Sequence, residues 1–222
     1  MTTQEPHETD VADLIRQAIL DGDLVPNQRL IEADLCVDYS ASRASVRGAL
    51  AELSNEGLVE RIPNRGARVR TVSIEEAIEI SEVRMVLEGL CASKAAELVT
   101  ADEARELQGL GQGMKDAFAV GDMMLYSVTN KKLHDRIGEI SRQHTAHQII
   151  LRSRAQIVRH QYRLAMRPGR PSVSLQEHLD IIDAICRHDP DGAEAALRHH
   201  LRSLIDALRM TSARIEREKE TQ

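Results

Sequence analysis

Residues 42–71 read SRASVRGALAELSNEGLVERIPNRGARVRT, and this stretch decides the fold of the N-terminal part of the chain. Its first half has apolar residues at helical spacing, namely Val46, Ala49, Leu50 and Leu53. That spacing predicts an amphipathic helix, which Gly57 ends because glycine adopts the left-handed conformation at little cost. The segments LVERI and ARVRT then predict two short strands joined by a turn at residues 63–66. A helix followed by an arginine-tipped hairpin is the pattern of a winged helix-turn-helix, whose recognition helix enters the major groove of DNA.

Charge is distributed unevenly along the chain. The 222 residues carry a formal net charge of −6, which taken alone argues against a nucleic-acid partner. Residues 42–72 nevertheless carry +3, which leaves −9 for the remainder. The arginines of this segment are Arg43, Arg47, Arg61, Arg65, Arg68 and Arg70. Local positive charge matters more for a DNA footprint than the net value, so the segment predicts binding to double-stranded DNA. The alternative is a solvated helix and hairpin with ordinary surface arginines.

Composition limits the remaining classes of protein. Hydrophobic residues make up 42% of the chain but aromatic residues only 2%, which indicates aliphatic cores of the kind that fill helix bundles. Scarce aromatics also argue against a single-strand or RNA binder, which stacks bases on exposed rings. The three cysteines lack CxxC spacing and are expected to be reduced core residues. Without a long apolar run or a signal-peptide pattern, we expect a cytoplasmic protein that does not associate with membranes.

Helix and turn signals divide the chain into four segments. Residues 1–9 are polar and expected to be flexible, and residues 10–72 form the predicted DNA-binding domain. Residues 73–217 are expected to be almost entirely helical and to form an effector-binding and dimerisation domain, and residues 218–222 to be a tail.

Within the helical segment, the spacing Ser/Thr-x-x-Glu recurs at Ser73, Thr100 and Ser174. This capping-box spacing predicts that a helix begins at each position. Six helices joined by short loops predict an all-α antiparallel bundle.

Polar residues fall on the inward faces of three of these helices. His134, His178 and His200 each occur in phase with apolar residues, and Asn130 precedes His134 by about one turn. Neutral imidazoles that converge in a bundle suit a divalent transition metal such as Zn, Ni, Mn or Fe. The alternative is that each histidine is an ordinary hydrogen-bonded core residue. Because an amide oxygen is a weaker ligand than a carboxylate, Asn130 predicts partial metal occupancy.

Arg84 is a cation on an inward helix face, in phase with Leu87 and Cys91. Two interpretations are open. It could form an ion pair within the bundle, or it could anchor the carboxylate of an effector, since arginine binds carboxylates through two parallel hydrogen bonds. We favour the effector anchor.

The N-terminal segments ILDGDLVPNQRLIEADL, SRASVRGALAELSNEGLVE and NRGARV resemble the DNA-binding domain of GntR-family transcription regulators. The resemblance covers residues 10–72. It implies that DNA is contacted by Arg43, Ala44, Ser45 and Arg47 on the recognition helix and by Arg65 and Gly66 in the wing. Asn27 and Ser40 stand where that family usually has glycine, and both are acceptable turn residues.

The remainder resembles the FCD effector domain of FadR-type GntR regulators. The matching segments are EVRMVLE at 82–88, NKKLH at 130–134, EHLDI at 177–181 and HHL at 199–201. The resemblance implies that Asn130 and the three inward histidines bind a metal, with a small organic acid close to it.

We therefore expect a metabolite-responsive transcriptional repressor rather than an enzyme. A homodimer would place two recognition helices on a near-palindromic operator, and a ligand in the bundle would shift their arrangement. The alternative is a metalloenzyme whose bundle histidines activate water. The nearby carboxylates of Asp135 and Glu177 fall outside the predicted inward face, which disfavours an enzyme. An architectural DNA-binding protein without a ligand would leave the inward polar residues unexplained.

Overall fold

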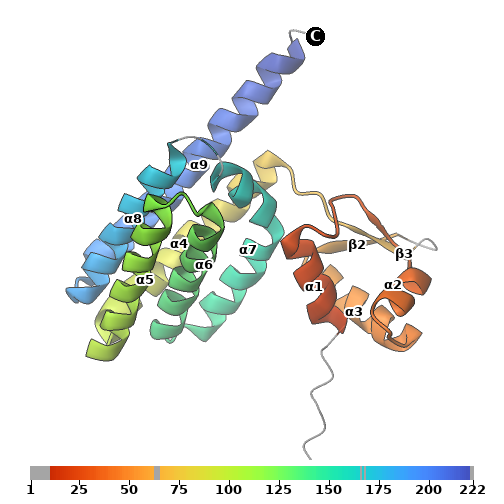
Figure 1. Ribbon diagram of the computed structural model, residues 1–222, viewed down its shortest axis with the longest axis horizontal. Coiled ribbons are helices and arrows are strands. Elements are labelled where there is room, and N and C mark those ends of the chain that lie inside the picture. Colours follow the sequence, from red (N-terminus) through yellow and green to blue (C-terminus); the bar gives the residue numbers. More distant parts are fainter. Residues whose placement is uncertain (1–10, 63–65, 166, 168, 221–222) are drawn as a thin grey trace, which may run out of the picture. The chain divides into compact units, whose positions relative to one another are not determined.

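The computed structural model describes residues 11–62, 66–165, 167 and 169–220 (Figure 1). The chain divides into two compact units, Met1–Val72 and Ser73–Gln222. The predicted flexible segment at residues 1–9 lies outside the described residues.

The N-terminal unit combines three helices with a small antiparallel sheet (Figure 1). Its elements are α1 (Val11–Asp21), β1 (Arg29–Leu30), α2 (Glu32–Asp38), α3 (Arg43–Asn55), β2 (Val59–Ile62) and β3 (Gly66–Val69). The predicted hairpin is present as β2 and β3, with Val59 opposite Val69. β1 pairs with the other edge of β3 and was not predicted, because two residues are too few to show the alternation of a strand.

Helix α3 is built as its sequence predicts. Ser42 caps it by accepting a hydrogen bond from the backbone N–H of Ser45. Val46 and Leu53 are fully buried, and α3 packs against α1, where Ile15 is fully buried too. The buried stripe therefore leaves the opposite face of α3 in solvent.

Two turns of the N-terminal unit adopt the left-handed conformation with non-glycine residues. Asn27 has φ 64° and Ser40 has φ 50°. These are the positions where the family resemblance leads one to expect glycine. The turns therefore keep the geometry that glycine favours, and Ser40 keeps it at a steric cost of about 1 kcal/mol.

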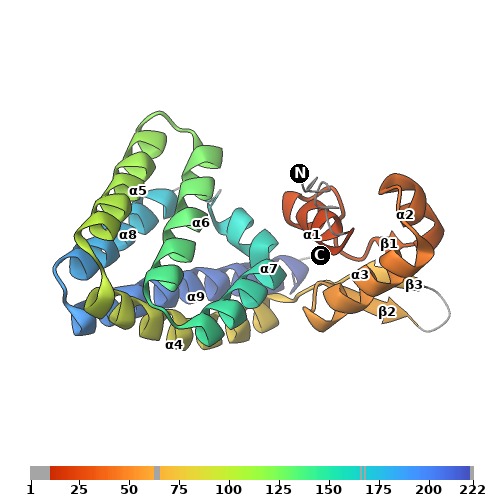
Figure 2. The ribbon, with the colours of Figure 1, turned by 90° about the horizontal axis from the view of Figure 1, so that it is seen from below.

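The C-terminal unit is all-helical. It comprises α4 (Ile74–Leu98), α5 (Ala101–Ala119), α6 (Met123–Ile140), α7 (His144–Ala165), α8 (Arg170–Cys186) and α9 (Pro190–Glu220). Figure 2 shows α4 along one edge of this unit with α9 beside it, and these two helices share the most extensive packing. The core is aliphatic, as the composition predicts. Among the described residues, no helix has the length and apolarity needed to cross a membrane.

Two helix boundaries differ from the prediction. The capping box at Thr100 is confirmed, with both reciprocal hydrogen bonds to Glu103 present. The capping box predicted at Ser174 is wrong, because α8 already begins at Arg170 and Ser174 is buried inside it. Helix α9 continues to Glu220, past the predicted end near Arg217.

Candidate DNA-binding helix and buried histidine site

The predicted DNA-contacting residues lie on the exposed side of the first turns of α3. The exposed residues are Arg43, Ala44, Ser45 and Arg47. Arg47 forms an ion pair with Glu32 of α2, with 2.8 Å between Nε and Oε2. Its side chain remains 62% exposed, so the ion pair holds the guanidinium at the surface, on the side of α3 that faces α2.

The wing is described only in part, since Arg65 lies outside the described residues. Gly66 begins β3 with φ 88°. A Cβ atom at this position would lie 2.8 Å from the carbonyl oxygen of Leu30. Glycine is therefore required for the close approach of β1 and β3, whatever its part in DNA contact.

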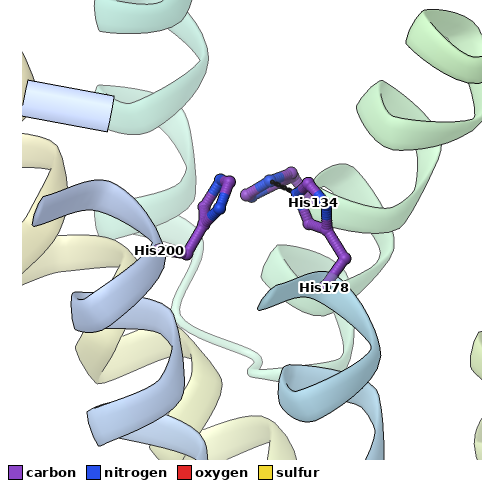
Figure 3. Close-up of side chains that lie close together, drawn as sticks. All are labelled: His134, His178 and His200. Carbon is purple, nitrogen blue, oxygen red and sulfur yellow. Dashed lines mark hydrogen bonds between the residues drawn. The ribbon is translucent and has the colours of Figure 1, made fainter. Parts of the chain in front are cut away.

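Three histidines from three helices meet inside the C-terminal unit (Figure 3). His134 comes from α6, His178 from α8 and His200 from α9, and none is more than 9% exposed. One ring nitrogen of each lies within 4.8 Å of the others. The Nε2 atoms of His134 and His178 are 3.1 Å apart. The convergence that helix phase predicted is present.

The far nitrogen of His134 is held by a buried carboxylate. Its Nδ1 lies 2.8 Å from Oε2 of Glu88, which is 4% exposed. The other oxygen of Glu88 accepts hydrogen bonds from Nε and Nη2 of Arg84, at 2.8 and 2.7 Å. A carboxylate beside Nδ1 favours the histidine tautomer that carries its proton on Nδ1. The lone pair of Nε2 then faces the point where the three histidines meet.

His200 is held in the same way by a second buried pair. Its Nδ1 lies 2.8 Å from Oε2 of Glu177, which is 5% exposed. Arg170 pairs with Glu177 through Nη2 at 3.1 Å. His178 has a weaker support, since its Nδ1 lies 3.4 Å from the hydroxyl of Ser174. Two Arg–Glu–His chains, Arg84–Glu88–His134 and Arg170–Glu177–His200, thus approach one point from different helices.

The expectation that Glu177 lies off the inward face is therefore wrong. Both it and Glu88, which helix phase did not single out as a site residue, are buried beside the histidines. Their oxygens are engaged by imidazole and guanidinium groups, so they orient the histidines rather than face an open substrate space. Asp135, by contrast, pairs with Lys131 and Arg154 at the edge of the unit.

Burial keeps the rings of His134 and His178 neutral. Burial, opposed by Glu88, lowers the pKa of His134 to about 4. Burial and the neighbouring His200 and His134 lower the pKa of His178 well below its usual value. Burial opposes ionisation of Glu88, but Arg84 and His134 hold the pKa of its carboxyl well below the usual value. At neutral pH the rings of His134 and His178 are therefore uncharged while Glu88 and Glu177 are ionised. A neutral imidazole is the form of histidine that binds a metal.

Asn130 precedes His134 by one turn on α6. Its Oδ1 is buried and has no hydrogen-bond partner among the described residues. Residues four apart lie on the same face of a helix, so this unsatisfied acceptor is on the side of α6 that carries His134. A buried acceptor without a partner costs free energy, and a cation would satisfy it.

Arg84 is 1% exposed and forms the ion pair within the bundle that was one of its two interpretations. Its Nη1 is buried and has no hydrogen-bond partner within the described part of the chain. The N–H groups of Nη1 are thus available to an effector. A carboxylate that bound both Nη1 and Nη2 in parallel would displace Glu88 from Nη2.

A winged helix-turn-helix joined to a separate helical unit is the arrangement of a class of two-domain DNA-binding transcription regulators. Residues 8–69 match the family model of bacterial regulatory proteins of the gntR family, and residues 79–203 match the FCD domain. The chain belongs to the GntR family of transcription regulators and carries an FCD domain.

Individual relatives agree with this assignment. The chain is 24% identical over 205 residues to the HTH-type transcriptional repressor RspR of Escherichia coli K12, covering 92% of this chain and 90% of the relative. It is 27% identical over 202 residues to a probable D-xylose utilization operon transcriptional repressor of Paenarthrobacter nicotinovorans, covering 90% and 87%. The solved structure of E. coli McbR/YncC has the same fold, with a TM-score of 0.79 at 22% identity over 94% of this chain and all of that one. RspR and the Paenarthrobacter relative are both named transcriptional repressors. Together with the two family models, these names indicate that this chain is a transcription regulator and not an enzyme.

Proposed function

We propose that this regulator represses transcription from an operator near its own gene and that a small organic acid bound in the helical unit changes its affinity for that operator. The observation that carries the proposal is the convergence of His134, His178 and His200 inside the unit joined to the DNA-binding unit. Burying three imidazole rings in an aliphatic core costs free energy, so a purely structural role does not explain why they are there.

The residues fit a divalent metal ion. Two histidines have Nδ1 bound to carboxylates, which leaves Nε2 as a ligand, and Oδ1 of Asn130 is a buried acceptor without a partner among the described residues. His134, His178, His200 and Asn130 would hold the ion, and Zn, Ni, Mn or Fe suits such nitrogen-rich donors. When bound, the ion would supply a Lewis acid for an anionic ligand. Glu88 and Glu177 would fix ring orientation from behind.

The effector proposed is a small organic acid. Arg84 offers the buried Nη1 without a hydrogen-bond partner in the described residues, on a helix that contributes Glu88 to the histidine centre. A carboxylate that accepts from Nη1 would compete with Glu88 for the same guanidinium. Such competition would couple effector binding to the position of α4.

Repression and a homodimer complete the proposal. RspR and the Paenarthrobacter relative are named repressors, which supports repression here. A single recognition helix reads only a few base pairs, so two copies on a near-palindromic operator are expected.

The direct test of the metal site is calorimetric titration of chelator-treated protein with Zn²⁺, Ni²⁺ and Mn²⁺, alongside thermal unfolding. We expect one ion per chain for at least one metal, and about 2.7 kcal/mol of stabilisation at a free concentration 100-fold above the dissociation constant. His178→Gln should abolish both effects, whereas His199→Gln, a change at the exposed neighbour of His200, should abolish neither. Equal metal binding by wild type and His178→Gln would refute the site.

A further inference from the structure

Helix α7 lies in a strongly positive stretch of the chain. Between Glu139 and Glu177 the sequence has seven arginines and no acidic residue, so this segment carries +7 and the remainder −13 within a net charge of −6. Some of these arginines are used inside the helical unit, since Arg154 pairs with Asp135 and Arg170 with Glu177. The positive charge is local to one segment of an acidic protein, and local charge determines whether a surface attracts polyanions.

Three other arginines form a line along the outer face of α7, which Figure 1 shows on the outside of the helical unit. This α7 arginine stripe consists of Arg152, Arg159 and Arg163, whose spacings of seven and four residues place them on one face of the helix. Arg152 and Arg163 are exposed. The buried residues of α7 lie on the opposite face and are Ala146, Ile150, Ile157 and Leu164. The stripe therefore faces solvent along the length of the helix.

The two ends of the stripe are not neutralised by the chain. Arg152 and Arg163 form no hydrogen bond or ion pair within the described part of the protein. Arg159 lies about one turn before Arg163, and like charges at that spacing destabilise a helix. Burial, together with Arg163, lowers the pKa of the Arg159 guanidinium. A row of like charges that disfavours its own helix is explained when an external anion binds it.

We propose that the α7 arginine stripe binds phosphates of double-stranded DNA, in addition to the contacts made by the recognition helix. Guanidinium groups donate parallel hydrogen bonds to phosphate oxygens, and such contacts are independent of base sequence. From Arg152 to Arg163 the helix rises about 16 Å, and a duplex carries one charge per roughly 1.7 Å of its axis. The stripe is thus long enough to meet several phosphates.

DNA fits the stripe better than other polyanions. Single-stranded nucleic acid is bound through aromatic rings that stack on bases, and only 2% of this chain is aromatic. The chain belongs to a family of DNA-binding regulators, so a duplex is held by the same protein. β3 ends at Val69 and α4 begins at Ile74, which limits the tether between the two units to roughly 17 Å. DNA held by α3 is therefore at high effective concentration for the helical unit.

Salt titration of DNA binding by the full-length protein tests the stripe. The probes are DNA flanking the gene and a duplex of random sequence, with no effector present. In Arg152→Gln/Arg163→Gln, the slope of log affinity against log salt should be smaller in magnitude by about 1.8 for each chain bound, because each phosphate contact contributes about 0.9. Affinity should fall by the same factor on both probes, because phosphate contacts carry no sequence information.

Two matched variants separate the stripe from charge in general. Lys115→Gln/Lys132→Gln removes the same charge from exposed positions of α5 and α6 and should keep the wild-type slope. Arg152→Lys/Arg163→Lys keeps the charge and should restore the slope. An equal loss in Lys115→Gln/Lys132→Gln would overturn the proposal. An unchanged slope in Arg152→Gln/Arg163→Gln would also overturn it and would leave the stripe to an acidic protein partner.

A single substitution covers the case in which the double variant misfolds. Arg152→Gln alone should reduce the slope by about 0.9 for each chain bound while its helical circular-dichroism signal stays that of wild type. A wild-type slope in this variant would contradict the proposal. The effector response of the proposed function is measured separately, so its failure leaves this test unaffected.

Discussion

Neutral, buried His134 makes the metal-free protein sensitive to mild acid. The pKa of its ring is about 4 in the folded protein, against 6.5 in an unfolded chain. Between these values the unfolded state binds more protons than the folded state, so the free energy of unfolding falls as the pH falls. At pH 5 the solution is about 1.5 pH units below the pKa of the unfolded ring, which is therefore protonated, while most folded rings stay neutral. The loss from this residue is then about 2 kcal/mol relative to pH 7.5.

The measurement is urea unfolding at pH 7.5 and pH 5 in the presence of a chelator. His134→Gln should lose about 2 kcal/mol less than wild type over this interval. His199→Gln removes an exposed ring and should behave like wild type. The interval from pH 7.5 to pH 5 avoids the contribution of Glu88. Because the pKa of its carboxyl is lowered, this residue reduces the free energy of unfolding mainly at pH values below the ordinary pKa of glutamate. Equal pH dependence in wild type and His134→Gln would show that the ring is not buried in its neutral form.

Four further predictions concern the DNA-binding unit. Arg47→Ala should weaken operator binding by about 1–3 kcal/mol in a gel-shift titration. Glu32→Gln, which removes the ion-pair partner of Arg47, should leave operator affinity equal to or above that of wild type. A loss of affinity as large as that of Arg47→Ala would mean that the ion pair only stabilises the domain and that Arg47 does not contact DNA. Gly66→Ala should lower the free energy of unfolding by about 1–3 kcal/mol, because the new Cβ would meet the carbonyl of Leu30 at positive φ; unchanged denaturant midpoints would disprove the requirement. Ser40→Val should be less stable than Ser40→Gly by about 1–2 kcal/mol, and equal stability would exclude a left-handed Ser40.

Periodicity in the sequence predicted most of the fold. The apolar stripe of α3 and the strand-like runs around residues 63–66 predicted the winged helix, and helix phase alone placed His134, His178 and His200 inside the bundle. Those signals succeed because burial of one face is what positions a helix. β1 was missed because a two-residue strand depends on its partner and not on its own pattern.

The carboxylates of the site were missed for a different reason. Phase analysis treats Glu as a residue of the solvent face, and the spacing from Ser174 to Glu177 suggested a helix start. The correct signal was present, since Ser174, Glu177 and Ile181 share one helical stripe. Charged residues are buried only when paired. The partners of Glu177, which are Arg170 and His200, are too far along the chain for local spacing to identify. For Glu88 a local signal existed, since Arg84 lies one helical turn before it, and only its second partner, His134, is distant.

The central claim is that the buried histidine centre controls operator binding. Fluorescence anisotropy with DNA flanking the gene tests it, with a panel of small organic acids and each metal added in turn. In wild type, at least one acid should change the operator dissociation constant at least five-fold, and chelator should remove the effect. His178→Gln should bind the operator with unchanged affinity yet show no response. A response of the same size in His178→Gln would contradict the account.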